Sequence, residues 1–131
     1  MMNRPPGSPA LDILSFEKSF HGRTLGTLSS TRSKPIHKLD IPAFNWPKAP
    51  FPVIRYPLEE NVSENRREED QCLEQLESIV RTWHNPIAAI IIEPIQGEGG
   101  DNQASSYFYQ KLRSITKKYD ILMIVDEVYT I

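Results

Sequence analysis

Two continuous apolar segments constrain the fold of this chain more than any other feature. Residues 87–94 read IAAIIIEP, and residues 121–128 read ILMIVDEV. Neither segment shows the alternation of polar and apolar side chains that a half-exposed strand would have. Continuous runs of this kind are typical of parallel strands that are covered on both faces.

The segment between these two runs has the spacing of a helix. Its apolar side chains recur every three or four residues, at Phe108, Leu112, Ile115 and Tyr119. Asn102 and Ser105 are both suitable N-caps for this helix. Strand, helix and strand make a βαβ unit over residues 87–128, right-handed by the usual rule. The sequence therefore predicts an α/β fold with a parallel sheet.

Upstream of this unit the sequence predicts a strand at residues 13–16, a turn at Gly22, and then a short helix or loop. Residues 61–83 predict a longer helix, whose buried stripe consists of Cys72, Leu73, Leu76, Ile79, Val80 and Trp83. We expect its acidic residues to form a solvated face rather than a metal site. These residues are Glu64, Glu68, Glu69, Asp70, Glu74 and Glu77.

Residues 34–60 are rich in proline, which blocks helix formation and favours extended backbone at the preceding residue. A disordered linker would explain the prolines, but such linkers are poor in aromatic residues. Here Phe44, Trp46, Phe51 and Tyr56 alternate with the prolines. The segment is therefore predicted to be extended and to lie against another surface.

Composition excludes several classes of function. The chain has 131 residues, enough for one domain with a core, and its net charge of −2 provides no basic surface for nucleic acid or membrane. A single cysteine, Cys72, excludes an internal disulfide and a cysteine-based metal site. No segment approaches the length of a membrane-spanning helix, and the N-terminus lacks the pattern of a targeting segment. A small molecule is the expected partner.

Each of the two apolar runs ends in an acid, Glu93 in the first and Asp126 in the second. Ligands of open parallel sheets bind beyond the carboxyl ends of the strands, so both acids should face one crevice. One such acid is often only a helix cap. Two on paired strands, one followed by the glycine-rich loop 96–103, favour a site. A carboxylate there needs a positive partner, such as a metal ion, a basic side chain or a protonated ring nitrogen.

A metal ion is the weaker of these alternatives. Four apolar residues followed by Asp126 and Glu127 have the form of a Walker B segment, as in a Mg²⁺-dependent nucleotide hydrolase. That class also needs a phosphate loop of the form G-x-x-x-x-G-K-[ST], which the sequence lacks. His21, His37 and His84 have no ligand spacing among themselves.

A protonated ring nitrogen points to pyridoxal phosphate, whose enzymes use an aspartate to keep the pyridine nitrogen protonated. The segment FHGRT at residues 20–24 supplies further parts of such a site. Phe20 and His21 form an aromatic pair, and Gly22 allows the backbone to come close. Arg23 can bind a carboxylate through two parallel hydrogen bonds.

Taken together, the segments SFHGRT, IIIEPIQGEGGDN and IVDEV resemble the class III pyridoxal phosphate-dependent aminotransferases. The segment SKPIHKLDIPAFNWPKAPFPVIRYPLEEN is similar to the eukaryotic 4-aminobutyrate (GABA) aminotransferases of that family. The resemblance covers the chain from about residue 5 to residue 128. It implies that residues 1–131 are an internal part of the large cofactor-binding domain of a fold-type I aminotransferase, with an incomplete set of βαβ units.

The resemblance implies cofactor roles for five residues. Asp126 would pair with the pyridine nitrogen, and Glu93 would lie beside Asp126. Phe20 and His21 would be the aromatic pair at the cofactor, with His21 over the ring face. Tyr129 occupies the position of a family glutamine that bonds the phenolic oxygen of the cofactor.

The resemblance also implies a substrate and a reaction. Arg23 would bind the carboxylate of GABA, and Glu98 would pair with a distant arginine until an α-carboxylate substrate arrives. The family reaction is a ping-pong amino transfer in a homodimer, which converts GABA and 2-oxoglutarate to succinate semialdehyde and glutamate. The family occurs in mitochondria and in the cytosol.

Three departures from the family pattern bear on activity. Tyr129 replaces the glutamine, and Ile131 replaces a glycine. The lysine that forms the Schiff base, and a loop that binds the cofactor phosphate, have no counterpart in this sequence. None of the lysines present matches that position: Lys18, Lys34, Lys38, Lys48, Lys111, Lys117 and Lys118. Residues 1–131 alone are expected to be inactive. The chain is expected to be part of a working enzyme, and the alternative is an inactive binding piece.

Overall fold

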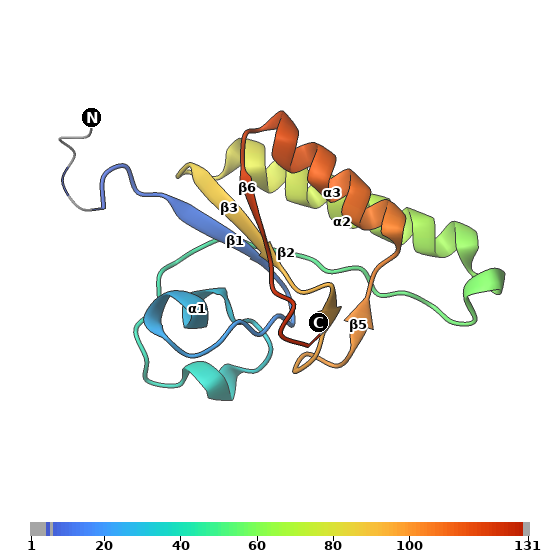
Figure 1. The fold of residues 1–131 in the computed structure, drawn as a ribbon, viewed down its shortest axis with the longest axis horizontal. Coiled ribbons are helices and arrows are strands. Elements are labelled where there is room, and N and C mark those ends of the chain that lie inside the picture. Colours follow the sequence, from blue (N-terminus) through green and yellow to red (C-terminus); the bar gives the residue numbers. More distant parts are fainter. Residues whose placement is uncertain (1–4, 6, 130–131) are drawn as a thin grey trace.

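The computed structural model describes residue 5 and residues 7–129. Most of its strands form one parallel sheet, in the order β2–β1–β3–β6 (Figure 1). These strands are β1 (Asp12–Phe16), β2 (Lys48–Ala49), β3 (Ile87–Ile92) and β6 (Leu122–Val125). A separate antiparallel pair joins β4 (Ile95–Gln96) to β5 (Asn102–Gln103). Residues 1–4 and 6, part of the N-terminus in which no targeting pattern was found, lie outside the described residues.

The two long helices, α2 (Val62–Thr82) and α3 (Ser106–Lys118), lie side by side on one side of the sheet (Figure 1). The short helix α1 (Leu25–Ser30) lies on the opposite side. Two 3-10 turns, η1 (Pro35–Lys38) and η2 (Leu58–Glu60), interrupt the proline-rich segment. The predicted α/β class with a parallel sheet is confirmed, since β3 and β6 are adjacent parallel strands joined through α3.

The structure decides between the two candidate N-caps of α3. Ser105 is the cap, and its Oγ accepts a hydrogen bond from the backbone N–H of Phe108 at 3.4 Å. Asn102 instead lies in β5. The predicted apolar face is buried against the core at Phe108, Leu112 and Ile115.

Three phenylalanines from separate segments meet in the core. Phe16 of β1, Phe51 of the proline-rich segment and Phe108 of α3 contact one another edge to face, with centroid separations of 5.9 to 6.3 Å. Phe51 thus anchors the proline-rich segment to the core, as the aromatic residues predicted. Phe44 and Tyr56 are nevertheless exposed, and Phe44 stacks on Trp46 at 4.9 Å.

The two apolar strands differ in burial, which the sequence did not predict. Ile90 and Ile92 of β3 are buried, because β3 lies between β1 and β6. β6 is at the edge of the sheet, and Leu122 is 71% exposed. The expectation that β6 is covered on both faces is therefore wrong for the described residues.

The acidic face of α2 also needs one correction. Glu69 is only 2% exposed, and its carboxylate accepts hydrogen bonds from the backbone N–H and the hydroxyl of Ser105, both at 2.7 Å. This carboxylate secures the N-terminus of α3 rather than facing solvent. Its burial is tolerated because both oxygens have donors.

Candidate functional site

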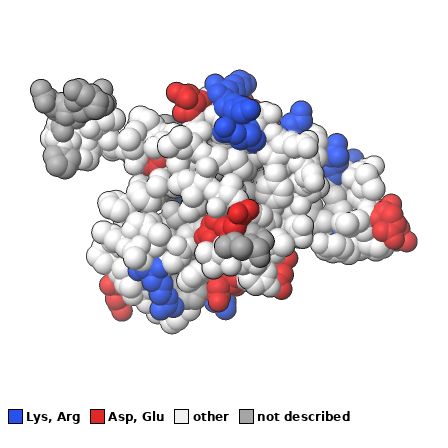
Figure 2. Space-filling view, in the orientation of Figure 1, with Lys and Arg blue, Asp and Glu red and all other residues white. Residues whose placement is uncertain are grey.

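A cavity of about 550 Å³ lies beyond the carboxyl ends of β3 and β6. The fold brings together there nearly all of the residues that the sequence singled out. Six of them line the cavity: Phe20, His21, Glu93, Glu98, Asp126 and Tyr129. Figure 2, in the orientation of Figure 1, shows acidic atoms near the centre of this face, while both acidic and basic side chains lie around its edge. The expectation that Glu93 and Asp126 face one crevice is confirmed.

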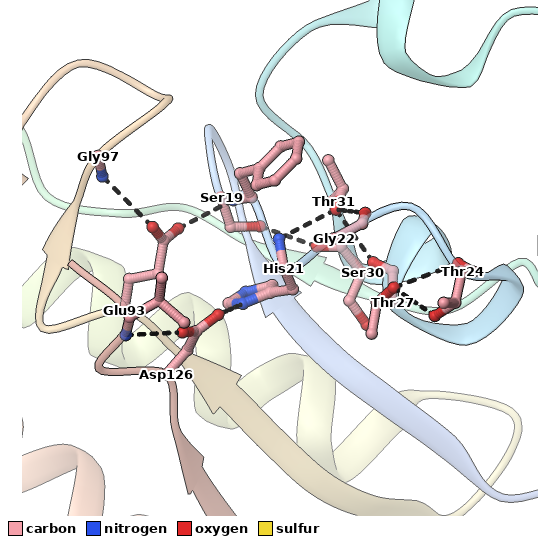
Figure 3. A network of polar contacts seen from close by, with 12 residues as sticks. Ser19, His21, Gly22, Thr24, Thr27, Ser30, Thr31, Glu93, Gly97 and Asp126 are labelled. Carbon is pink, nitrogen blue, oxygen red and sulfur yellow. Dashed lines mark hydrogen bonds and ion pairs between the residues drawn. The ribbon is translucent and has the colours of Figure 1, made fainter.

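Asp126 stands where β6 ends, and its backbone N–H continues the ladder by donating to the Ile92 carbonyl at 2.8 Å. One carboxylate oxygen, Oδ2, lies 2.9 Å from Nδ1 of His21, and the other accepts from the backbone N–H of Val128 at 3.2 Å. Figure 3 shows the two side chains of the His21–Asp126 pair pointing toward each other. The carboxylate therefore has a fixed orientation before any ligand is present.

The protonation of the His21–Asp126 pair follows from its hydrogen bonds. A carboxylate can only accept, so we assign the proton of the bond to Nδ1 of His21. Nε2 of His21 is buried and has no hydrogen-bond partner among the described residues. A proton on Nε2 would be an unsatisfied buried donor, which is costly, so the imidazole is assigned as neutral. The pair then carries one negative charge at the wall of the cavity.

The backbone of His21 is held by Thr31, the residue at which α1 ends. Its N–H donates to Oγ1 of Thr31 at 3.0 Å, and the same hydroxyl lies 3.0 Å from the carbonyl of Gly22 (Figure 3). Gly22 has a φ of +114°, a conformation that side chains with a Cβ rarely adopt. The sequence HG is therefore suited to turning the chain sharply after the aromatic pair, as predicted.

Glu93 links the two loops that form the walls of the cavity. Its Oε1 accepts from the backbone N–H of Phe20 at 2.9 Å, and its Oε2 accepts from that of Gly97 at 3.3 Å (Figure 3). Burial raises the pKa of Glu93 above its ordinary value, and the two backbone donors oppose this shift by stabilising the carboxylate.

This raised pKa predicts a pH-dependent stability. The folded protein binds the Glu93 proton more tightly than the unfolded chain does. The contribution of Glu93 is thus full below its unfolded pKa and is lost as the pH rises through its folded pKa. The amide side chain of a Glu93→Gln variant cannot ionise. We therefore expect the stability difference, wild type minus variant, to fall as the pH rises above about 4.

Urea unfolding at a series of pH values measures this difference, with exposed Glu59→Gln as the control for removal of a charge. A stability difference for Glu93→Gln that stays constant or grows with pH would contradict the assigned shift.

The remaining predicted site residues differ in their placement. Arg23 is exposed, precedes α1, and is not among the residues that line the cavity. Glu98 lines the cavity and is exposed, on the loop between β4 and β5. The ring of Tyr129 packs on Gly97, since a Cβ at Gly97 would lie 3.2 Å from Tyr129 Cδ2. Ile131, the other departure near the end of the sequence, lies outside the described residues.

Sequence reasoning missed one residue that supports this cavity. Gln96 is fully buried and joins the loop after β4 to the turn after β1 through its side-chain amide. A polar residue between an apolar strand and a glycine-rich loop was a signal that could have identified it. The contact between His21 and Asp126 had no such signal, because 105 positions separate the two residues.

A metal centre would need a cluster of ligand side chains. In residues 5 and 7–129, His, Cys, Asp and Glu side chains form no group of three or more that could hold a metal ion. The helices of this part of the chain include none that is both long and apolar enough to cross a membrane.

Comparison with known proteins supports the site. Residues 3–130 match the family described as aminotransferase class-III. The 4-aminobutyrate aminotransferase of Dictyostelium discoideum is 65% identical over 99% of this chain and 26% of its own length. The human mitochondrial 4-aminobutyrate aminotransferase is 54% identical over 99% of this chain and 27% of its own length.

A solved structure extends the comparison to the fold. The lysine aminotransferase from M. tuberculosis superposes with a TM-score of 0.83, at 37% identity, over 93% of this chain and 28% of that chain. The chain therefore spans about a quarter of the length of the proteins that it matches. With its parallel sheet, its acids beyond β3 and β6 and this match over nearly its whole length, the chain belongs to the class-III aminotransferases, a family of pyridoxal phosphate-dependent transferases.

Proposed function

We propose that the protein carrying this chain is a 4-aminobutyrate:2-oxoglutarate aminotransferase that uses pyridoxal 5'-phosphate. It would convert GABA and 2-oxoglutarate to succinate semialdehyde and glutamate in a ping-pong reaction. The observation that carries the proposal is the His21–Asp126 pair at the wall of the cavity, in which the side chain of His21 is buried and that of Asp126 is partly exposed. Its support is the 53–65% identity to proteins named 4-aminobutyrate aminotransferase, of which the chain spans 26–28%.

The residues present fit the ring of the cofactor. When bound, pyridoxal phosphate would supply an electron sink for the bonds of the substrate amine carbon. Asp126 would hold a proton on the pyridine nitrogen, because its carboxylate is the negative group at the strand end. His21 would keep that carboxylate oriented and ionised by donating from Nδ1. None of the described residues that line the cavity is Lys or Arg, so the phosphate group would be held by residues other than these.

Burial suggests a division of labour within the aromatic pair. The side chain of His21 is only 1% exposed and is engaged by Asp126, which favours support of the carboxylate over stacking on a ligand. Phe20 lines the cavity and is half-buried, so we assign the contact with the ring face to Phe20. Glu93 would set the position of Phe20 through the backbone, and Tyr129 would meet the edge of the ring.

Arg23 and Glu98 would bind substrate. Arg23 would donate hydrogen bonds to the carboxylate of GABA. Glu98 would pair with a distant arginine until an α-carboxylate substrate arrives. Removing a charged hydrogen-bond partner costs about 1.5–3 kcal/mol, so Arg23→Ala should raise KM for GABA by about 10- to 100-fold. Steady-state kinetics of the protein carrying this chain measure the change, with exposed Arg81→Ala as the control. An unchanged KM would remove Arg23 from this role.

The assay that tests the proposed function is amino transfer from GABA to 2-oxoglutarate in the presence of pyridoxal phosphate. Formation of both succinate semialdehyde and glutamate supports the proposal. Cofactor binding without transfer would favour the alternative, an inactive binding piece of the family. We further propose a homodimer in the cytoplasm or in mitochondria, where the human and pig relatives are named as mitochondrial.

A further inference from the structure

Two neighbouring loops contribute residues to the lining of the cavity. One is the segment from Glu17 to Phe20, which follows β1, and the other is residues 97–101, between β4 and β5. Phe20 belongs to the first loop, while Gly97 and Glu98 belong to the second, and all three line the cavity. The relative position of these loops therefore contributes to the shape of the site.

Gln96 makes a second side-chain connection between the two loops, in addition to that of Glu93. Its side chain is 1% exposed, and Nε2 donates to the backbone carbonyl of Glu17 at 2.8 Å. Its Oε1 accepts from Nδ2 of Asn102 at 2.9 Å, and the same Nδ2 lies 3.2 Å from the carbonyl of Gly99. Both ends of the loop are thus tied to one buried amide, which itself does not line the cavity.

The backbone packing between the loops supports this connection independently. At Gly99 an added Cβ would overlap the carbonyl oxygen of Lys18, so the two backbones are in direct contact. Lys18 itself has a φ of +65°, which turns that carbonyl toward the glycine loop. A loop that packs this closely has little freedom, provided that the buried amide keeps it in place.

We propose that Gln96 is a positioning residue that holds Gly97 and Glu98 at a fixed distance from Phe20 before any ligand arrives. The inference rests on the proposed function only in assigning Phe20 to the cofactor and Glu98 to the substrate. Gln96 touches neither, and it acts through the loop that carries Glu98. Glu93 secures the same two loops from the cavity side, through one oxygen to each.

Hydrogen exchange of the protein carrying this chain tests the positioning directly. Gln96→Met keeps the length of the side chain and removes both hydrogen bonds. We expect the amides of residues 97–101 to exchange about tenfold faster, the effect of losing about one net hydrogen bond. The amides of α2 should be unchanged. Gln103→Met, an exposed position in the same hairpin, is the matched control.

A second variant keeps the test decisive if Gln96→Met folds poorly. Asn102→Asp has the same size and loses the amide donor to Gln96 and Gly99, so residues 97–101 should again exchange faster than in the wild type. Unchanged exchange of residues 97–101 in whichever variant folds would overturn the inference.

Kinetics distinguish positioning from a general structural role. Gln96→Met and Glu98→Gln should each raise KM for the amino-acid substrate. The double variant should raise KM by less than the product of the two single-variant increases, because the loop that carries Glu98 is already displaced when Gln96 is replaced. Independent effects would overturn the action through Glu98. If the wild type transfers no amino group, the proposed function fails, and hydrogen exchange still decides whether Gln96 positions the loop.

Discussion

Replacing Asp126 by asparagine should lower kcat for amino transfer by about 10³-fold, the scale of losing one preorganised electrostatic contact in an active site. Asparagine has the shape of aspartate, and its single oxygen can still accept from the N–H of Val128, but its amide nitrogen cannot accept from the Nδ1–H of His21. It is neutral, and it therefore cannot hold a proton on a ring nitrogen. The loss should appear in kcat, because the charge is proposed to act in the reaction rather than in substrate binding.

Asp120→Asn is the matched control for this experiment. Asp120 is exposed at the opposite end of β6, and its φ of +54° is a conformation that asparagine tolerates well. We expect this control to keep the activity of the wild type. If Asp126→Asn also retained activity within tenfold, Asp126 would not be the partner of a protonated ring.

Replacing Phe108 by alanine should lower the free energy of unfolding by about 3–5 kcal/mol, as for other buried aromatic residues. Phe108 is fully buried, and its ring contacts Phe16, Phe51 and Tyr109. The change leaves a cavity where α3, β1 and the proline-rich segment meet. Because β1 leads to Phe20, which lines the cavity, the variant should also bind cofactor more weakly at temperatures near its midpoint.

Phe44→Ala is the control, since Phe44 is half exposed and its ring stacks on Trp46. Urea unfolding of both variants measures the difference, and we expect the control to lose less than about 1.5 kcal/mol, the upper range for an aromatic pair beyond its buried area. Equal losses at the two positions would contradict the proposed arrangement of the core.

The strands and helices that carry the site were largely predictable from local pattern. Uninterrupted apolar runs predicted β3 and β6, and helical spacing predicted α2 and α3. The rule that ligands bind beyond parallel strands brought Glu93 and Asp126 to one cavity, as the structure confirms. Motif resemblance predicted four of the other residues that line it, namely Phe20, His21, Glu98 and Tyr129.

The features that the sequence did not predict depend on contacts between distant residues. The exposure of β6 follows from its place at the sheet edge, which an apolar run does not reveal. In the sequence, Glu69 is indistinguishable from the other acids on the polar face of α2, and only its contact with Ser105 explains its burial. The contact of His21 with Asp126 and the buried amide of Gln96 likewise depend on partners far away in the sequence.

The central claim, that Asp126 meets a protonated cofactor ring, is tested most directly by spectroscopic titration of the protein carrying this chain. Pyridoxal phosphate is one titrant, and ATP with Mg²⁺ is the other. We predict saturable binding of pyridoxal phosphate, weakened by Asp126→Asn and unaffected by Asp120→Asn. Tight binding of ATP with Mg²⁺, together with no response to pyridoxal phosphate, would contradict the claim and would make Asp126 a metal ligand instead.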